Sequence, residues 1–360
     1  MLRSYAIEHL RPGMTVGRDV RNEQAQVIAK AGTKLNDAII NSFKGGGIFS
    51  VYIEETAVAK PNIPGSEHLL DDDYVKCYDS VATHTHQLYN KMMDTEELDV
   101  QELNYIVDEE ILPKLCNGAK AVSQIHNMGR EGLYLINHVL HVAILAGLMG
   151  KWMRWPKEKQ KDVVVSGLLH DLGKQKIPAD VLDKKGKLTD EEFKMIKKHP
   201  DYGYNMLKLG PLKKKQDILN GVLQHHERMD GSGYPNANKR ELISEFGRLL
   251  AVLDIYDAMA ADKIYVRRRS PFDVFEVLNG DIVRGKLDPE FGIYFIKNLN
   301  HALNGNWVGL TNGERGRIVY IDESRVNSLP IVQVSENKFV DLNRETSIKV
   351  ESILTANEVG

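Results

Sequence analysis

The feature that most restricts the fold of this chain is a set of histidine and aspartate residues that recurs through its middle. Successive members or pairs are roughly 30 residues apart, about the length of one long helix plus a return segment. A bundle of helices would therefore bring one ligand or ligand pair per pass to the same level, which is how helical bundles build metal sites. The set consists of His138, His170, Asp171, His199, His225, His226 and Asp254.

Each member of the set also has a simpler interpretation. His138, on an apolar segment, reads by itself as a hydrogen-bonded core histidine, and His225-His226 reads as an exposed polar pair. Asp254 is harder to explain in this way, because it lies on the apolar stripe of the segment 247–261. A buried carboxylate without a partner is costly, and a cation would remove that cost. The regular spacing of the whole set therefore favours a metal centre over independent core polar residues.

The ligand types indicate which metals fit. Mixed imidazole and carboxylate ligands suit transition metals such as iron, manganese, nickel or zinc, and not calcium. The two cysteines, Cys77 and Cys116, have no partner pattern, so we expect neither a thiolate site nor a disulfide framework. The set exceeds the need of one ion, and two divalent ions about 3.5–4 Å apart would use it well. Asp171 is the expected bridge, because it adjoins His170 and could reach both ions. His141 is expected to be only a neighbour of the cluster.

The layout of the chain is mainly helical. Residues 122–300 read as long helices and hold the whole histidine and aspartate set. The other segments are predicted to be a small β-rich N-terminal module over 1–60, a helical linker region over 61–121 and a small β-rich C-terminal module over 301–360. Within the helical part, Thr189–Glu192 fits a capping box, and Pro200 is expected to close the helix that precedes it.

Charge and hydropathy exclude several classes of protein. The net charge is −3 and the pI is about 6.5, whereas a protein that binds nucleic-acid polymers usually has a basic surface. The N-terminus lacks the apolar core of a signal peptide. The longest apolar run, near Val139–Gly150, is interrupted by His141 and is too short to span a bilayer. We therefore expect no nucleic-acid polymer as partner, no membrane insertion and a cytoplasmic location.

Two segments resemble the signatures of a known family. Residues 170–174 read HDLGK, which resembles the HDxGK signature of the HD superfamily, and residues 225–235 read HHERMDGSGYP. The second segment resembles the long and specific HHExxDGxGYP signature of the HD-GYP family. The similarity continues at His199 and Gly203 and through Asp254–Met259, and it covers about residues 122–300. It implies an HD-type helical bundle, to which the flanking β-rich modules are additions of a kind often found in the family.

The resemblance also implies an activity. HD-GYP proteins are cyclic di-GMP phosphodiesterases with a bi- or trinuclear metal centre, often of iron. Carried over by motif, the seven histidines and aspartates become the metal ligands, Asp171 and Lys174 the catalytic residues, and Lys174 a phosphate contact. Trinuclear members carry a glutamate one turn before the first histidine, where this chain has Tyr134. We therefore expect two divalent transition-metal ions, iron first, with manganese, nickel or zinc as alternatives.

The glycine-tyrosine-proline segment supplies the expected substrate contacts. Gly233 lets the loop approach a ligand closely, and Tyr234 has a π-face on which a guanine can stack. Pro235 favours an extended backbone at the tyrosine. By itself the segment would read as a turn, and the adjacent His-His-Glu sequence gives it its functional interpretation.

One part of the chain departs from the family. Where the family often reads Asp-Arg-Pro-Tyr-Arg, residues 262–266 read DKIYV. Lys263 keeps a charge but loses the bidentate fork of arginine, and Val266 loses a charge. Arg267 either compensates as a substrate contact or belongs to a solvated surface run. The departure concerns substrate binding more than metal binding.

Three functions are weighed on this basis. The first is hydrolysis of cyclic di-GMP or a related cyclic dinucleotide, by metal-activated hydroxide, to the linear dinucleotide or GMP. The second is an HD hydrolase of another nucleotide, against which the glycine-tyrosine-proline segment argues. The third is a regulatory protein that binds a cyclic dinucleotide with little turnover, against which the complete ligand set argues. The partners expected for the first function are the dinucleotide, a second copy in a homodimer, and a diguanylate cyclase or other signalling protein.

Overall fold

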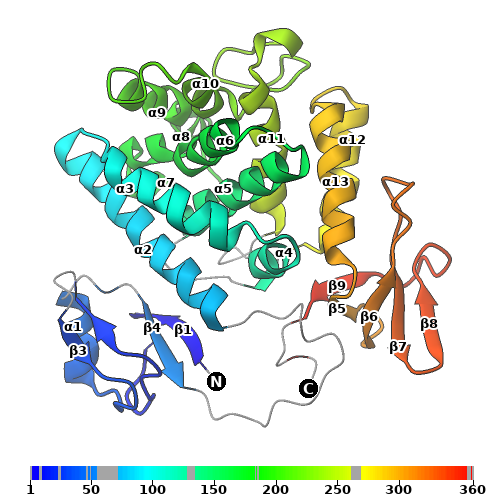
Figure 1. Cartoon of the computed structure of the whole chain (residues 1–360), viewed down its shortest axis with the longest axis horizontal. Coiled ribbons are helices and arrows are strands. Elements are labelled where there is room, and N and C mark those ends of the chain that lie inside the picture. The colour runs from blue at the N-terminus through cyan, green and yellow to red at the C-terminus, as the bar shows by residue number, and fades with distance from the viewer. Residues whose placement is uncertain are drawn as a thin grey trace. The chain divides into compact units, whose positions relative to one another are not determined.

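The computed structural model (Figure 1) describes residues 2–7, 10–22, 26–45, 48, 50–54, 72–127, 134–182, 184, 186–260, 269–354 and 358. These residues fall into two compact units. One contains the described residues up to Glu54, and the other contains those from Asp72 onward, apart from Tyr134.

The N-terminal unit combines short strands with one helix. Strands β1 and β4 pair antiparallel, as do β2 and β3. Apolar side chains of the strands and of α1, with Phe43 fully buried, form a separate small core. This confirms a small β-rich module at the N-terminal end of the chain. Its elements are β1 (Leu2–Ala6), β2 (Val20–Arg21), β3 (Val27–Ala29), α1 (Asp37–Gly45) and β4 (Ser50–Glu54).

The larger unit is mainly helical (Figure 1), which confirms the predicted fold class. Its first helices are α2 (Asp72–Thr95), α3 (Val100–Tyr105), a π-helical segment (Ile106–Leu115), α4 (Gly118–Asn127), α5 (Tyr134–Trp152) and α6 (Lys157–Leu169). They are followed by the 3-10 turn η4 (Leu172–Lys176), α7 (Ala179–Leu182), α8 (Asp190–Ile196), α9 (His199–Leu207), α10 (Gln216–Gln224) and the 3-10 turn η5 (Arg240–Leu242). The last helices are α11 (Glu245–Ala260), α12 (Pro271–Val283) and α13 (Pro289–Leu303).

Helix α5 is the central helix of this unit. It is buried from Ile136 to Gly150, so the helix is covered around its whole circumference rather than on one stripe. By length and composition it would also pass as a membrane span, but 83% of that apolar window is covered by the rest of the structure. His138 and His141 are thus placed inside a protein core.

Helix ends follow local sequence signals, with one exception to our expectation. Thr189 and Glu192 form the predicted capping box at the start of α8. Pro200 does not close a helix: α8 already ends at Ile196, and Pro200 lies in the first turn of α9. A proline is tolerated there because the first turn of a helix has no intrahelical partner for its N–H groups. The correction matters for the site, because His199 thereby begins a helix.

The C-terminal end of the chain forms an antiparallel sheet with the strand order β8-β7-β6-β5-β9. One face buries Ile318, Val332 and Val340, which are neighbours in register across β6, β7 and β8. The strands are β5 (Trp307–Leu310), β6 (Arg315–Tyr320), β7 (Ile331–Ser335), β8 (Lys338–Asp341) and β9 (Val350–Ile353). The division into four segments stays a prediction. Two of its boundaries, at 121/122 and 300/301, fall inside α4 and α13, because both helices continue past them.

Candidate metal centre

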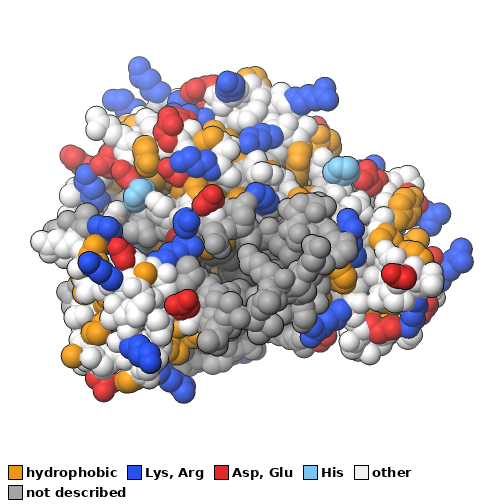
Figure 2. Space-filling view, turned by 60° about the horizontal axis from the view of Figure 1, so that its bottom comes forward, with side chains coloured by type: hydrophobic (Ala, Val, Ile, Leu, Met, Phe, Trp, Pro, Cys, Tyr) orange, Lys and Arg blue, Asp and Glu red, His pale blue; other side chains and the backbone are white. Residues whose placement is uncertain are grey.

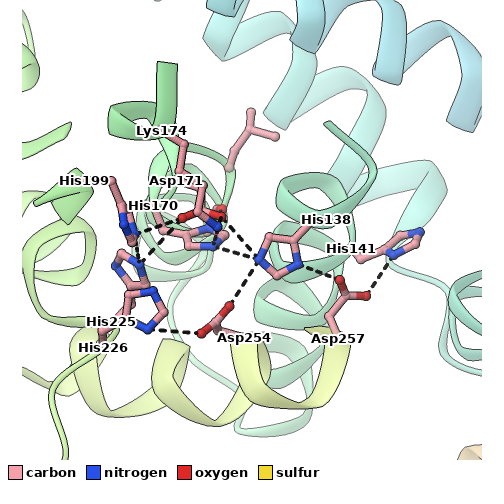
Figure 3. A network of polar contacts seen from close by, with 12 residues as sticks. His138, His141, His170, Asp171, Lys174, His199, His225, His226, Asp254 and Asp257 are labelled. Atoms are coloured by element: carbon pink, nitrogen blue, oxygen red, sulfur yellow. Dashed lines mark hydrogen bonds and ion pairs between the residues drawn. The ribbon is translucent and has the colours of Figure 1, made fainter. Parts of the chain in front are cut away.

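The histidines and aspartates singled out in the sequence lie in one cluster (Figure 3). Most of them stand at the ends of short elements, where the chain changes direction. His138 lies in the second turn of α5, and Asp254 lies within α11. The others follow one another at helix ends: His170 after α6, Asp171 before η4, His199 at the start of α9, and His225 with His226 after α10. The helices thus deliver one or two ligands per pass.

Three of the imidazoles are oriented by the same local device. In each of them, Nδ1 lies within hydrogen-bond distance of the backbone carbonyl three residues earlier. A carbonyl oxygen only accepts, so Nδ1 must carry the hydrogen, and Nε2 of the neutral ring presents a lone pair to the cluster. The pairs are His170 with Gly167 (2.7 Å), His199 with Ile196 (2.8 Å) and His225 with Val222 (2.8 Å).

Asp171 lies between two pairs of imidazoles. Its Oδ1 is 3.1 Å from Nε2 of His199 and 3.8 Å from Nε2 of His225. Its Oδ2 is 3.4 Å from Nε2 of both His138 and His170. One carboxylate oxygen facing each ligand pair is the arrangement expected of a carboxylate that bridges two ions.

Lone pairs on the nitrogen and oxygen atoms of the cluster point toward one another, and a cation between them would make this arrangement favourable. Nε2 of His199 is 3.1 Å from Nε2 of His225 and 3.1 Å from Oδ1 of Asp171. Burial and the neighbouring imidazoles hold the pKa of His225 well below its usual range. Its ring is therefore neutral, and its Nε2 faces Nε2 of His199 with a lone pair rather than a proton. Two ligands at right angles on an ion, each about 2.1 Å away, would lie about 3 Å apart. The donor set and its spacing therefore fit a bound transition metal.

Asp254 connects the two sides of the cluster. Its Oδ1 is 3.1 Å from Nε2 of His138, and its Oδ2 is 3.5 Å from Nδ1 of His226. Burial lowers the pKa of His226 to about 3. Burial also opposes a charge on His138, but Asp254 and Asp257 outweigh it and raise the pKa of that imidazole to about 10. The two carboxylates on either side of the ring therefore favour positive charge at this position.

A close backbone approach fixes Asp171 relative to His199. The turn η4 packs against α9 at Gly173, where an added Cβ would lie 2.0 Å from the carbonyl oxygen of His199 and 2.5 Å from the amide nitrogen of Gly203. Only a residue without a side chain fits this contact. Gly173 and Gly203, which belong to the family signatures noted in the sequence, thus fix the separation of Asp171 and His199.

The glycine-tyrosine-proline loop folds back onto the histidine pair. Glu227 is buried, and its carboxylate accepts hydrogen bonds from the amides of Asn236 (2.8 Å) and Asn238 (3.0 Å). The ring of Tyr234 stacks on His226, with centroids 4.6 Å apart and an interplanar angle of 26°. Gly233 packs so tightly that an added Cβ would lie 2.4 Å from the amide nitrogen of Arg228. The loop is therefore built as a wall of the cluster.

Two lysines bring positive charge to the cluster. Nζ of Lys174 lies 2.5 Å from Oδ2 of Asp171. Lys197 lies over two rings, 4.7 Å from the centroid of Phe193 and 5.3 Å from that of Tyr234. Lys197 carries no motif signal that sequence reasoning could have used. Of the remaining candidate substrate contacts, Lys263 and Arg267 lie outside the described residues.

Comparison with known proteins finds a domain and relatives that are similar to this chain. Residues 119–291 match the family model of the HD domain. The chain is 30% identical over 224 residues to the cyclic di-GMP phosphodiesterase PA4108 of Pseudomonas aeruginosa, across 62% of this chain and 53% of that protein. It is 29% identical over 216 residues to the 3'3'-cGAMP-specific phosphodiesterase 2 of Vibrio cholerae, across 58% of this chain and 38% of that protein. The chain thus spans about half, or less, of the length of these relatives.

A solved structure has a similar fold. It is that of Bd1817, an HDG"Y"P protein from Bdellovibrio bacteriovorus, with a TM-score of 0.52 and 16% sequence identity, across 82% of this chain and 98% of that chain. The helical segment that carries the cluster is an HD domain. The HHERMDGSGYP segment lies inside this matched region and resembles the HD-GYP signature.

Proposed function

We propose that this chain hydrolyses a cyclic dinucleotide, with cyclic di-GMP as the first candidate, at a centre of two transition-metal ions. The observation that carries the proposal is Asp171, whose two oxygens face two separate pairs of imidazoles. The glycine-tyrosine-proline loop, stacked on His226 through Tyr234, adds an aromatic wall suited to a nucleobase. The names of the relatives support the same class of substrate.

The proposed ligands are the seven histidines and aspartates of the cluster, with Asp171 as the bridge. Bound metal ions would lower the pKa of a coordinated water and neutralise the non-bridging phosphate oxygens. Three of these imidazoles are oriented by backbone carbonyls, which would hold their Nε2 atoms toward the ions. Mixed imidazole and carboxylate ligands suit iron, manganese, nickel or zinc, and the resemblance to HD-GYP proteins puts iron first in this proposal.

The protein's own groups would bind and orient the substrate. Lys174 would place a fixed positive charge beside the scissile phosphate. Gly233, Tyr234 and Pro235 would line the base, and Lys263 and Arg267 are proposed as outer phosphate contacts. A substrate panel tests the proposal: cyclic di-GMP, a cyclic GMP–AMP hybrid, a nucleoside triphosphate and a guanosine tetraphosphate, each followed by product separation. Turnover of the last two alone would favour the general HD hydrolase, and binding without any turnover would favour the regulatory protein.

The wider setting of the protein is proposed on the same basis. We propose a cytoplasmic protein whose partner is the dinucleotide itself, with a homodimer and a diguanylate cyclase as further candidates. The net charge of −3 argues against a nucleic-acid polymer as partner, and on the face shown in Figure 2 the basic and acidic side chains of the described residues are interspersed.

The ligand set predicts two metal ions per chain. The trinuclear HD-GYP proteins that this chain resembles carry a glutamate one turn before the first histidine, where Tyr134 begins α5 here, and a phenol is a poor substitute for a carboxylate. Metal analysis of fully loaded protein should therefore give about two ions per chain. A stoichiometry of three, or three well-occupied ions in a crystal structure, would contradict this prediction.

Replacing Lys174 should weaken both binding and turnover. We expect Lys174→Ala to lower kcat/KM for cyclic di-GMP by about tenfold to a hundredfold, since a charge-assisted hydrogen bond contributes roughly 1.5–3 kcal/mol. Part of the loss should appear in kcat, because the contact tightens as charge develops on the phosphate. Steady-state kinetics measure both constants. Lys176→Ala, in the same 3-10 turn but half-exposed, is the matched control; an equal loss in both variants would argue against the assignment.

A further inference from the structure

His138 is held differently from the other imidazoles of the cluster. It lies within α5, where the carbonyl three residues earlier accepts a hydrogen bond from the helix backbone. The contact between Nδ1 and a backbone carbonyl that orients the other three imidazoles is therefore not available to His138. Instead, Nδ1 of His138 lies 2.7 Å from Oδ2 of Asp257, a fully buried carboxylate on α11 (Figure 3). A carboxylate only accepts, so this contact fixes the hydrogen on Nδ1 and turns Nε2 toward the cluster.

Two carboxylates of helix α11 contact the imidazole ring of His138, one at each nitrogen. Asp254 and Asp257 stand one turn apart on α11, and they contact the two nitrogens of His138: Asp254 contacts Nε2 at 3.1 Å and Asp257 contacts Nδ1 at 2.7 Å. One contact is on the metal side of the ring and the other is behind it. A contact of the second kind sets the tautomer and the rotation of a metal-binding histidine.

His141 completes the arrangement. It is 1% exposed, and its Nδ1 donates to the other oxygen of Asp257 at 2.8 Å. Its Nε2 is buried and has no hydrogen-bond partner among the described residues. A buried imidazole with one unsatisfied nitrogen lowers the stability of the fold. Any favourable role of His141 therefore comes from its hydrogen bond to Asp257. That contact occupies the second oxygen of Asp257 and keeps the first on His138.

We infer that Asp257 and His141 are positioning residues, which hold His138 in its metal-binding tautomer and orientation. This inference rests on the metal centre of the proposed function, and it revises the expectation that His141 is only a neighbour of the cluster. The two residues touch neither substrate nor metal. They act through His138, across the contact between α5 and α11.

The test is the affinity of each folded variant for Mn²⁺, measured by competition with a chelator of known affinity. Asp257→Asn keeps the shape of the side chain but cannot accept from both imidazoles, and it should weaken Mn²⁺ binding by about tenfold to a hundredfold. His141→Gln should weaken it less, by about tenfold or below. Asp288→Asn is the matched control, because Asp288 is also buried and caps α13 away from the cluster. It should lower the thermal midpoint of the metal-free protein and leave Mn²⁺ affinity unchanged.

A double-mutant cycle separates positioning from general stabilisation. If Asp257 acts through His138, then Asp257→Asn should have little further effect on Mn²⁺ affinity once His138 is replaced by alanine. Wild-type affinity in Asp257→Asn, or equal effects with and without His138, would overturn the inference. Neither readout depends on turnover. A wild-type protein that binds Mn²⁺ but hydrolyses no cyclic dinucleotide would therefore reject the proposed function and leave this inference standing.

Discussion

Replacing Asp171 by alanine should abolish hydrolysis and release metal. Its two oxygens face separate imidazole pairs, so the substitution removes a ligand from both proposed ions at once. Because metal-activated attack contributes several kcal/mol to the reaction, we expect the turnover number to fall by about a thousandfold or more. Turnover of cyclic di-GMP and metal content, measured on the same preparation, test this directly.

The control for this variant is another carboxylate of the same unit. Asp162→Ala removes a partly buried aspartate that forms an ion pair with Lys215, away from the cluster. It should keep both metal content and turnover. An Asp171→Ala protein with normal activity, or one that is inactive with two ions still bound, would refute the bridging role.

A single added methyl group at position 173 should disrupt the site without touching a ligand. In Gly173→Ala the Cβ would lie 2.0 Å from the carbonyl oxygen of His199, and backbone cannot move aside as a side chain does. Overpacking of this kind costs about 3 kcal/mol, which lowers the melting temperature by roughly 6–12 °C in a domain of this size. Since η4 and α9 must separate, Asp171 moves away from His199, and metal affinity should fall as well.

Thermal unfolding and metal titration test this prediction, and the control is a glycine at which an added Cβ meets no neighbouring atom. Gly118 begins α4, and an added Cβ there meets no atom within 4 Å. Gly118→Ala should leave the melting temperature and metal affinity close to wild type. If Gly173→Ala behaves in the same way, the close approach of η4 and α9 does not determine the geometry of the cluster.

Much of the architecture could be predicted from the spacing of polar residues. Ligands that recur at about the length of a helix and its return indicate a bundle, and the structure brings His138, His170, His199 and Asp254 into one cluster. Asp171 as the bridge followed from its adjacency to His170, and the structure places one of its oxygens toward each imidazole pair. The capping box at Thr189 was predicted correctly, because it depends only on residues within one turn of the helix.

The remaining features depend on contacts between distant segments. Pro200 was assigned to the wrong side of a helix boundary, because proline is compatible both with the end of one helix and with the first turn of the next. The contacts of Asp257 with His138 and His141 depend on how α5 and α11 are placed against each other, which no local pattern encodes. Glu227 lies inside a recognised motif, but its two bonds to the loop amides appear only once the loop is folded.

The most direct test of the account is metal-dependent hydrolysis by the intact chain. The protein would be purified without oxygen, its metal content measured, and the sample incubated with cyclic di-GMP before and after chelation, with products separated by chromatography. We predict about two ions per chain, and conversion to linear dinucleotide or GMP that stops on chelation and returns when metal is restored. A folded protein with both ions bound that converts neither cyclic di-GMP nor a cyclic GMP–AMP hybrid would contradict the account.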